Sequence, residues 1–240
     1  MRFGIIGDIH SNLHALDRVL ECLDAEDVDQ ILCVGDIVGY GAYPSECIRK
    51  LRELEIPSVA GNHDFGVVGK TSIEYFNPDA RNAVLWTREQ LTNEEKDFLE
   101  SLPLTMELPG FCLAHGTLHE PQLFEYIQTV YDAFLSFQAL NKKICFLGHS
   151  HVPITFFDDN PISYVLEPEI PVGDVGKMLV NVGSVGQPRD QDPRAAYAIY
   201  DTDEKKIWIK RVMYDIESAA TSIREAGLPI MNAERLWLGR

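Results

Sequence analysis

The sequence predicts an α/β fold, and three observations support this prediction. Short apolar runs with strand character alternate with amphipathic helical stretches through the first half of the chain, which is the pattern of βαβ units. The 240 residues, of which 45% are hydrophobic, are enough to bury a sizeable core. The chain also lacks internal repeats and Ser/Pro/Gly-rich linkers, so we expect a single domain over residues 1–240.

The first half of the chain predicts three strands, with a helix after each of the first two. Leucines recur at helical spacing from Leu13 to Leu23 and form one apolar face. Pro44 stands where the first turn of a helix tolerates proline, and Ile48 and Leu51 form the buried stripe of that second helix. The predicted strands cover residues 3–7, 31–34 and 58–60.

From about residue 65 to residue 109 the strand alternation lapses, and the composition becomes polar and helical. Thr92 and Glu95 have the spacing of a capping box, which predicts the start of a helix inside this stretch. We therefore expect a helical insertion at about 65–109, set beside the sheet.

Short strands return after the insertion, and the stretch 152–214 is expected to be mostly antiparallel. We expect a helix through 126–140 and a tail helix over 216–226, which Gly227 and Pro229 would end. The predicted strands cover residues 111–114, 144–147, 155–157, 178–182, 197–200 and 207–213.

Charge and cysteine content limit the classes of partner and compartment. Lys and Arg number 21 against 37 Asp and Glu, and the net charge of −16 argues against a broad surface for nucleic acid or an anionic membrane. The five cysteines include no C-x-x-C pair, so we expect reduced thiols in a soluble, cytoplasmic protein. We find no signal peptide and no apolar run near the roughly 20 residues that span a bilayer.

Five of the seven histidines fall in short motifs that each begin where a predicted strand ends. In open α/β sheets, ligands bind in the crevice beyond the carboxyl ends of the strands, so we expect these side chains to lie together. Imidazole and carboxylate ligands suit manganese, iron, zinc or nickel, and seven candidate ligands exceed what one ion takes with a position left open. The motifs are Gly7-Asp8-Ile9-His10, Gly35-Asp36, Gly61-Asn62-His63-Asp64, Ala114-His115-Gly116 and Gly148-His149-Ser150-His151.

In this order the motifs resemble the signature of the calcineurin-like metallophosphoesterase superfamily, over residues 5–151. The loop 181–189 also resembles the Asn-x-Gly-Ser loop of its compact bacterial and archaeal phosphodiesterase branch. The resemblance implies a four-layer αββα sandwich of two mixed β-sheets flanked by helices. It also implies two divalent transition-metal ions, the first held by Asp8, His10 and His151, the second by Asn62, His115 and His149, with Asp36 bridging them.

The same resemblance implies a mechanism. A metal-bridging hydroxide would attack phosphorus in line, and His63 would protonate the leaving group. Of the possible metals, manganese is the one we favour. Two divalent ions against Asp8, Asp36 and a hydroxide leave a charge of about +1 in the cleft, which would attract a small phosphate ester even to a chain of net charge −16.

One departure from the family pattern narrows the substrate. Protein serine/threonine phosphatases carry Gly-Asp-x-Val-Asp-Arg-Gly, but here Gly39 and Tyr40 occupy the positions of the second aspartate and the arginine. The sequence therefore favours a phosphodiester or a dinucleoside polyphosphate, such as diadenosine tetraphosphate, over a phosphomonoester or phosphoprotein. A non-catalytic protein-binding scaffold on the same fold is the alternative from another class, and the presence of His10 and His63 argues against it.

Other catalytic signatures are absent from the sequence. There is no P-loop, no Gly-x-Ser-x-Gly elbow, and no Gly-x-Gly-x-x-Gly loop after the first strand. The P-loop, serine hydrolase and dinucleotide-binding classes are therefore excluded.

Several side chains near the motifs have two interpretations each. Asp64 either orients His63 or caps the next turn, and we favour the cap. Arg189 either contacts a substrate phosphate or forms a salt bridge with Asp190 or Asp192. Asn12 either reaches the substrate or caps a helix, and we favour the cap. For His14 and His119 we expect structural or surface roles. Five aromatic residues either form a stacking wall for a base or pack the insertion onto the sheet: Tyr40, Tyr43, Tyr75, Phe76 and Trp86.

Overall fold

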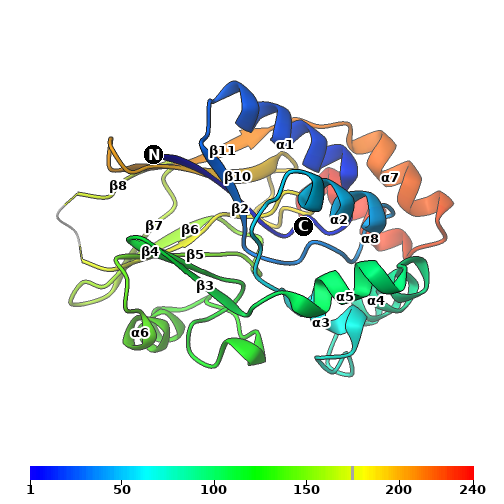
Figure 1. Cartoon of the computed structure of the whole chain (residues 1–240), viewed down its shortest axis with the longest axis horizontal. Helices are drawn as coiled ribbons and strands as arrows, with labels where there is room; N and C mark the ends of the chain where they lie inside the picture. The colour runs from blue at the N-terminus through cyan, green and yellow to red at the C-terminus, as the bar shows by residue number, and fades with distance from the viewer. Residues whose placement is uncertain (174–175) are drawn as a thin grey trace.

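Two mixed β-sheets stacked face to face form the centre of the molecule, and helices cover the outer side of each sheet (Figure 1). The computed structural model describes residues 1–173 and 176–240. This arrangement is the four-layer αββα sandwich that the sequence predicts, so the expected fold is confirmed.

The first sheet has the strand order β2-β1-β10-β11-β8. The pair β1 and β2 is parallel, whereas every other neighbouring pair in this sheet is antiparallel. Its strands span Arg2–Ile6 (β1), Gln30–Cys33 (β2), Glu169–Pro171 (β8), Ala195–Asp201 (β10) and Lys206–Val212 (β11).

The second sheet has the strand order β3-β4-β5-β9-β6-β7. Here β4, β5 and β9 run parallel, and the remaining pairs are antiparallel. Its strands span Thr105–Leu108 (β3), Phe111–Ala114 (β4), Ile144–Leu147 (β5), Ile154–Phe157 (β6), Ser163–Val165 (β7) and Met178–Asn181 (β9).

The alternation of side chains along the strands explains why four layers form. Phe3 and Ile5 of β1 point into the core between the two sheets, where they meet Phe146 of β5. Ile6 of β1 points the other way, into the core beneath the helices, and Cys145 of β5 does the same on its own sheet. Because both faces of these strands are buried, their sequences are continuous apolar runs rather than alternating ones.

The helices fall into three groups by position (Figure 1). Leu13–Ala25 (α1), Pro44–Glu53 (α2) and Ile216–Glu225 (α7) lie over the first sheet, and Ile230–Leu238 (α8) packs against α7. Val130–Ala139 (α6) covers the outer face of the second sheet. Three helices pack together at one end: Asn62–Val68 (α3), Pro78–Gln90 (α4) and Asn93–Ser101 (α5).

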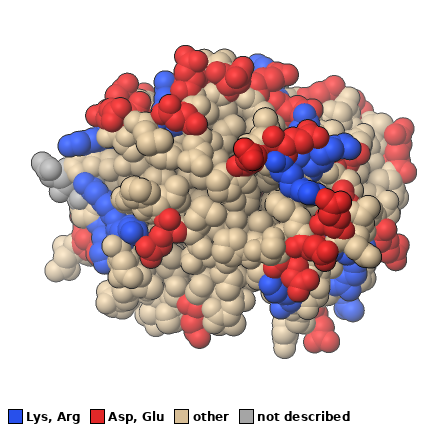
Figure 2. Space-filling view, viewed as in Figure 1, with Lys and Arg blue, Asp and Glu red and all other residues tan. Residues whose placement is uncertain are grey.

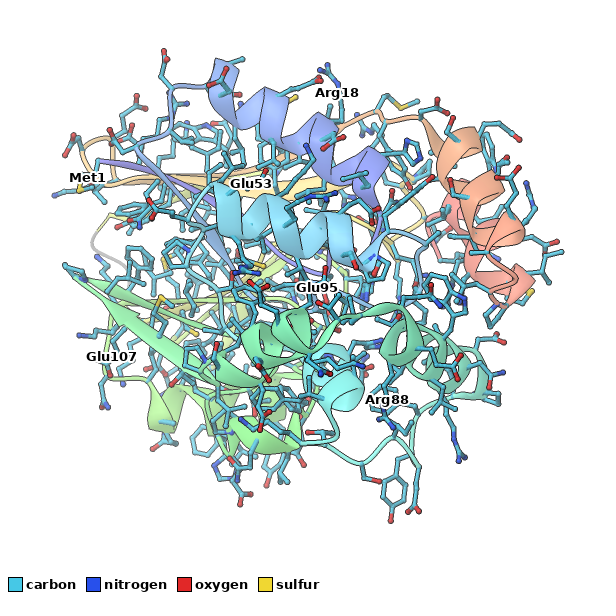
Figure 3. The ribbon with its side chains drawn as sticks, turned by 45° about the vertical axis from the view of Figure 1, so that its right-hand side comes forward. Met1, Arg18, Glu53, Arg88, Glu95 and Glu107 are labelled. Atoms are coloured by element: carbon cyan, nitrogen blue, oxygen red, sulfur yellow. The ribbon has the colours of Figure 1, made fainter. Side chains whose placement is uncertain are left out.

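Arg88 of α4 connects two members of this third group. Its guanidinium donates hydrogen bonds to the carbonyls of Gly66 and Val67 in α3 at 2.7 and 2.9 Å (Figure 3). Thr92 and Glu95 form the capping box that the sequence predicts at the start of α5.

The structure differs from the sequence expectations in several elements. Residues 58–60 form no strand, because only Ser58 makes a bridge, to Cys33. The helix expected from 126 begins at Val130, since Thr129 and Asp132 cap it there. The stretch 152–214 is mostly antiparallel, as expected, and its exception is β9, which runs parallel to β5. We did not anticipate α8, β3, β7 and β8.

Acidic side chains gather along the upper edge and right-hand side of the face shown in Figure 2. This distribution fits the net charge of −16 and leaves no broad basic surface on that face. Among the residues that the structure describes, no helix is long and apolar enough to cross a membrane.

Candidate metal centre

Eight side chains from five separated motifs meet at the carboxyl ends of the strands, as the sequence predicts. Hydrogen bonds between the turns hold them in register: Asp8 N donates to Gly35 O at 2.9 Å, and Gly148 N donates to His115 O at 2.9 Å. Seven of the eight side chains are at most 5% exposed, and Asn62 is half-buried. The eight are Asp8, His10, Asp36, Asn62, His63, His115, His149 and His151.

Most of these residues adopt a left-handed backbone conformation. Asp8, His10, Asp36, His149 and His151 have φ between 49° and 71°, a region that residues other than glycine seldom occupy. Each such residue costs about 1–3 kcal/mol and persists only where the surrounding structure holds it in place. The strand-end turns therefore hold the functional side chains in positions that the chain would not adopt on its own.

At two motif positions only glycine fits, because a carboxylate oxygen lies close to the backbone there. A Cβ built on Gly61 would overlap Asp36 Oδ1, and one on Gly148 would overlap Asp8 Oδ2. The carboxylates can therefore sit directly against the backbone of the neighbouring turn. Asp36 Oδ1 accepts a hydrogen bond from His63 N at 2.9 Å, which leaves Oδ2 free to face the histidines.

Backbone carbonyls fix the protons on three of the histidines. Each of the three rings donates its Nδ1–H to a carbonyl oxygen, so the Nε2 atom of the neutral ring keeps its lone pair. Outer partners of this kind orient metal-binding histidines in other proteins. The pairs are His10 with Val38 at 3.1 Å, His115 with Val34 at 2.8 Å, and His151 with Gln187.

The first candidate ligand group consists of Asp8, His10 and His151. His10 Nε2 lies 3.1 Å from His151 Nε2, and Asp8 Oδ1 lies 3.3 Å from His151 Nε2. Because the Nδ1 atom of each ring carries the proton, two lone pairs face each other across this short distance. Such lone pairs repel each other unless a cation lies between them, so this group fits a metal ion.

The second candidate group consists of Asp36, His115 and His149. His115 Nε2 lies 3.1 Å from His149 Nδ1, 3.3 Å from Asp36 Oδ2 and 3.3 Å from Asn62 Oδ1. Asp36 Oδ2 also lies 3.6 Å from His10 Nε2 in the first group. One oxygen of Asp36 therefore stands between the two groups, which is the position of a bridging ligand.

Burial and charge set the protonation of the histidine rings. For His115, burial opposes the charged form, but Asp36 and Asp8 raise the pKa to about 9. A metal ligand must be deprotonated, so an ion bound here would displace that proton, whereas the other rings are already neutral at pH 7. Burial lowers the pKa of these other rings, which are His10, His149 and His151, and His63 with a pKa of about 4.

His63 packs against the two positions that depart from the phosphatase pattern. The ring of Tyr40 lies 4.5 Å from that of His63 and 4.7 Å from that of His10, between centroids. A Cβ on Gly39 would overlap His63 Nδ1, which is buried without a hydrogen-bond partner in the described part of the chain. No side chain at position 39 could pair with His63 unless the ring moved.

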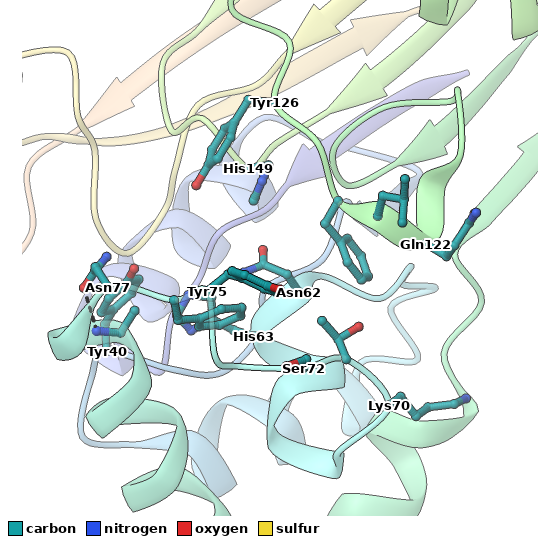
Figure 4. A pocket seen from close by; sticks show the side chains of 15 residues that line it. Tyr40, Asn62, His63, Lys70, Ser72, Tyr75, Asn77, Gln122, Tyr126 and His149 are labelled. Carbon is teal, nitrogen blue, oxygen red and sulfur yellow. Dashed lines mark hydrogen bonds between the residues drawn. The ribbon is translucent and has the colours of Figure 1, made fainter.

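A cavity of about 680 Å³ opens beside the candidate metal centre (Figure 4). Asn62, His63 and His149 line it on one side. Tyr126 stacks on His149, with ring centroids 3.8 Å apart and planes within 14°. Aromatic rings form much of the wall, from Tyr40, from Tyr75 and Phe76 in the loop before α4, and from Phe124 and Tyr126 before α6.

Lys70 is also part of the cavity wall, but its ammonium group is already engaged. It donates a hydrogen bond to Glu100 O at 2.8 Å and lies 4.6 Å from the centre of the Phe65 ring. In Figure 4 its side chain extends away from the other labelled residues. The wall is therefore mainly aromatic, without a free lysine directed at the centre.

The structure distinguishes between the two roles that the sequence left open for Asp64 and Asn12. Asp64 accepts hydrogen bonds from the backbone of Ile37, Val38 and Gly61, so it caps turns rather than bonding to His63. Burial and the neighbouring Asp36 raise the pKa of Asp64 to about 7, against these hydrogen bonds. Asn12 caps α1, and its amide also donates to Gly186 O at 2.9 Å.

Arg189 does not form the salt bridge with Asp190 or Asp192 that was one of its two possible roles. Asp190 pairs with Arg211, and Asp192 pairs with Arg194 at 2.6 Å and, at 4.0 Å, with Arg211. Arg189 instead donates to Gln187 Oε1 at 2.9 Å, and its guanidinium carbon lies 5.6 Å from the centre of the Tyr40 ring.

The remaining histidines and two of the five aromatic residues lie away from the site. Tyr43 bonds to Ser222 through its hydroxyl at 2.9 Å, and Trp86 packs against the helical core. His14 packs edge-on against Tyr43, and His119 is half-exposed beside Glu120. Three of the five aromatic residues thus contribute to the cavity wall, which favours the stacking interpretation for these three: Tyr40, Tyr75 and Phe76.

Sequence reasoning missed four residues near the site. Tyr126 was assigned to a helix that in the structure begins only at Val130, and no motif singled out Phe124 in the irregular segment before it. Gln187 stands two residues before Arg189 in the glycine-rich loop, which was the one available indication of its role. Arg235 lies on α8, which was not anticipated, and it also reaches Gln187 Oε1, at 3.3 Å.

Comparisons with known proteins agree with this geometry. A model of the calcineurin-like phosphoesterase superfamily domain matches residues 1–205. A metallophosphoesterase from Sphaerobacter thermophilus shares 42% identity and a TM-score of 0.89, over 100% of this chain and 99% of its own. An uncharacterized protein of Methanocaldococcus jannaschii is 42% identical over 99% of this chain and 98% of its own. A symmetrical bis(5'-nucleosyl)-tetraphosphatase of Pasteurella multocida is 27% identical over 40% of this chain and 41% of its own length.

The family match covers most of the chain, and it includes every motif from which the candidate metal centre is built. The chain therefore belongs to the calcineurin-like phosphoesterase superfamily.

Proposed function

We propose that this protein is a metal-dependent phosphodiesterase that hydrolyses a small phosphodiester or a dinucleoside polyphosphate. One observation carries the proposal: two groups of buried His and Asp side chains lie beside a cavity with aromatic walls, and Asp36 Oδ2 of the second group is 3.6 Å from His10 Nε2 of the first. The superfamily acts on phosphate esters, which fits a centre built for cations.

The contacts between the buried side chains support one assignment of ligands to each ion. Asp8, His10 and His151 would hold the first ion, Asn62, His115 and His149 the second, and Asp36 Oδ2 would bridge them. When bound, a pair of divalent ions lowers the pKa of water and draws the oxygens of a phosphate ester into the site. Imidazole, carboxylate and amide ligands without a thiolate suit manganese, iron, zinc or nickel, and of these we favour manganese.

His63 is the proposed proton donor to the leaving group. It lines the cavity next to both ligand groups and bonds to neither through its Nδ1 atom. Burial holds its pKa at about 4 in the free chain, so the ring is neutral before substrate arrives. The negative charge of a phosphate ester beside the ring would favour its protonated form, so we expect His63 to gain its proton together with the substrate.

The surroundings of His63 favour a diester over a monoester. Gly39 provides no carboxylate to His63, and Tyr40 provides a ring where the phosphatase pattern has an arginine. Without the arginine of the phosphatase pattern, the site loses one positive charge. This loss should weaken binding of a doubly charged monoester more than binding of a singly charged diester.

The cavity points to a substrate that carries an aromatic ring. Its volume of about 680 Å³ lies within the usual range for small-molecule sites, roughly 300–1,000 Å³. Bases stack readily on side chains such as Tyr75, Phe76 and Tyr126. A nucleotide-containing ester such as diadenosine tetraphosphate meets both requirements, and the similar protein of Pasteurella multocida is a tetraphosphatase of this kind.

A substrate panel with Mn²⁺ present tests the proposal. It compares 4-nitrophenyl phosphate, bis(4-nitrophenyl) phosphate, a cyclic nucleotide and diadenosine tetraphosphate. We expect kcat/KM for bis(4-nitrophenyl) phosphate or for diadenosine tetraphosphate to exceed that for the monoester by about tenfold or more. Turnover of the monoester alone would overturn the diesterase proposal, and an absence of both turnover and bound metal would favour the scaffold alternative.

A further inference from the structure

Two arginines that lie close to the candidate metal centre converge on one neutral side chain. Arg189 Nη2 and Arg235 Nη1 both donate to Gln187 Oε1, at 2.9 and 3.3 Å. Within residues 1–173 and 176–240, neither guanidinium has a carboxylate oxygen within 4.0 Å. In a chain with 37 acidic residues, two adjacent cations without an ionic partner are unexpected.

Gln187 ties these arginines to the metal centre. Its backbone oxygen accepts the Nδ1–H of His151, and its backbone N–H donates to Ser184 Oγ at 2.8 Å. Gln187 is only 2% exposed, so its side chain is held rigidly while it positions both arginines. The same residue thus orients a proposed metal ligand and the two cations.

Tyr40 connects the arginine pair to the cavity. The guanidinium carbon of Arg189 lies 5.6 Å from the centre of the Tyr40 ring, and that ring lies 4.5 Å from His63. Tyr40 also lines the aromatic cavity. A ligand that contacts His63 and passes along Tyr40 would therefore come within reach of Arg189.

The pair is left with unused hydrogen-bonding capacity and with mutual repulsion. Arg189 Nε is buried and has no hydrogen-bond partner in the described part of the chain. Burial and the nearby Arg189 together lower the pKa of Arg235. An anion between the two guanidinium groups would satisfy the donors and relieve the repulsion.

We infer that Arg189 and Arg235 form a subsite for a second phosphate group of the substrate, next to the phosphate that is cleaved. The planar guanidinium group binds phosphate or carboxylate through paired N–H donors, so an anionic ligand is favoured over a neutral group. We assign this anion to a second phosphate because the neighbouring centre is proposed to bind a phosphate ester. The inference rests on the proposed phosphoesterase activity and makes it specific: the preferred substrates carry at least two linked phosphates. Arg235 lies on α8, outside the residues 1–205 that match the family, so this subsite depends on the C-terminal part of the chain.

A binding experiment tests the subsite without catalysis. Methylenediphosphonate carries two linked phosphate-like groups and methylphosphonate carries one, and neither is a substrate for hydrolysis. Calorimetry with the full-length, metal-loaded protein gives the dissociation constant of each. We expect Arg235→Gln to weaken binding of the diphosphonate about tenfold more than binding of the monophosphonate. Arg224→Gln is the matched control, because Arg224 is exposed on α7 and the charge change is the same.

Kinetics give a second, independent measurement. We expect Arg235→Gln to lower kcat/KM for diadenosine tetraphosphate about 10- to 100-fold relative to bis(4-nitrophenyl) phosphate, mainly through KM. Arg189→Gln should shift the ratio in the same direction, and Arg224→Gln should leave it unchanged. Equal losses on both substrates and both phosphonates, or no loss on either, would overturn the inference. If the parent protein binds the diphosphonate through Arg235 yet hydrolyses no ester, the subsite stands and the proposed activity fails.

Discussion

The candidate metal centre and the aromatic cavity lie side by side but are built in different ways. The metal centre consists of buried side chains on strand-end turns, held by backbone hydrogen bonds and strained φ angles. The cavity wall comes largely from loop segments, before α4 and before α6, and Tyr75 on it is 94% exposed. The first region is buried apart from the half-buried Asn62, whereas the second combines buried rings such as Phe124 with the exposed ring of Tyr75.

This difference suggests that reaction chemistry and substrate choice are separable in this protein. Changes in the buried centre should abolish turnover of every substrate, because each ligand serves all of them. Changes in the wall should alter KM for some substrates and leave others unaffected. Substitutions in the buried centre and in the cavity wall test whether reaction chemistry and substrate choice are separable.

The largest effect is expected for Asp36→Asn. Asp36 Oδ2 faces both ligand groups, so loss of its charge should release metal and lower kcat by about 10³-fold or more for every substrate. Metal content by mass spectrometry and kcat are measured together. Asp24→Asn removes the same charge from an exposed position on α1 and should change neither. Full metal content in Asp36→Asn would contradict the bridging position.

His63→Gln should lower kcat by about 10²- to 10⁴-fold, the usual range for loss of a general acid. His63 lies within possible ligand distance of His10 and Asp36, but the proposed centre gives it no ligand role, so metal content should stay at the parent level. The loss should be smaller for bis(4-nitrophenyl) phosphate than for an alkyl diester, since nitrophenolate leaves without a proton. His119→Gln, a half-exposed position, is the control. Equal losses on both esters would remove His63 from the role of proton donor.

A smaller effect, confined to some substrates, is expected for Tyr75→Ala. Stacking of a base on an aromatic side chain contributes about 1–3 kcal/mol, so KM for a nucleotide ester should rise about 5- to 100-fold while kcat changes little. A diester without a ring should show no change. Tyr131→Ala on α6 is the control, because Tyr131 is similarly exposed but does not line the cavity. A uniform loss on both esters would show that wall and centre are not separable.

The same contrast explains how much of the site the sequence could predict. Residues such as Asp8 and His115 were predictable because each follows an apolar strand, and parallel strands bring their carboxyl ends to one edge. Phe124 and Tyr126 were not, because the helix expected from residue 126 begins only at Val130, which leaves both residues in the irregular segment before it. The partner of Asp190 could not be found either, since Asp190 lies in the loop before β10 and Arg211 lies 21 residues away on β11.

Elements of the fold also divide into those that the sequence could predict and those that it could not. The apolar runs of β1, β4 and β5 predicted strands correctly, since both faces of these strands are buried. Residues 58–60 also look like a strand, but they make only a single bridge to β2, at Cys33, and Ala60 N then donates to Pro103 O instead of continuing the ladder. Gly227 ends α7 as expected, yet the chain resumes as α8 because that helix can bury Ala233 and Leu236 in the core shared with α7.

The smallest effect is expected for Thr92→Ala, at the start of α5. The Thr92 hydroxyl accepts a hydrogen bond from Glu95 N at 3.3 Å and donates one to Glu95 Oε2 at 2.9 Å. Thr92→Ala removes both bonds, which costs about 1 kcal/mol in the free energy of unfolding, and leaves the bond from Thr92 N to Glu95 Oε2 at 2.8 Å. Although partial burial opposes it, bonding to Thr92 lowers the pKa of Glu95 below its ordinary value of 4.5. The stabilisation is therefore present above about pH 4.5 and is lost as the pH falls through the lower pKa of the folded chain.

Urea unfolding at pH 7 and at pH 3 measures this cap, and Thr92→Ser, which keeps the hydroxyl, is the matched control. We expect KM and kcat to remain at parent values, because the loop that carries Tyr75 is tied to α5 at its other end, where Lys70 bonds to Glu100 O. If KM for the nucleotide ester rose in Thr92→Ala but not in Thr92→Ser, the cavity wall would depend on the first turn of α5. The wall would then be part of a cooperative unit with the helices behind it, and substrate choice would be coupled to the stability of that end of the molecule.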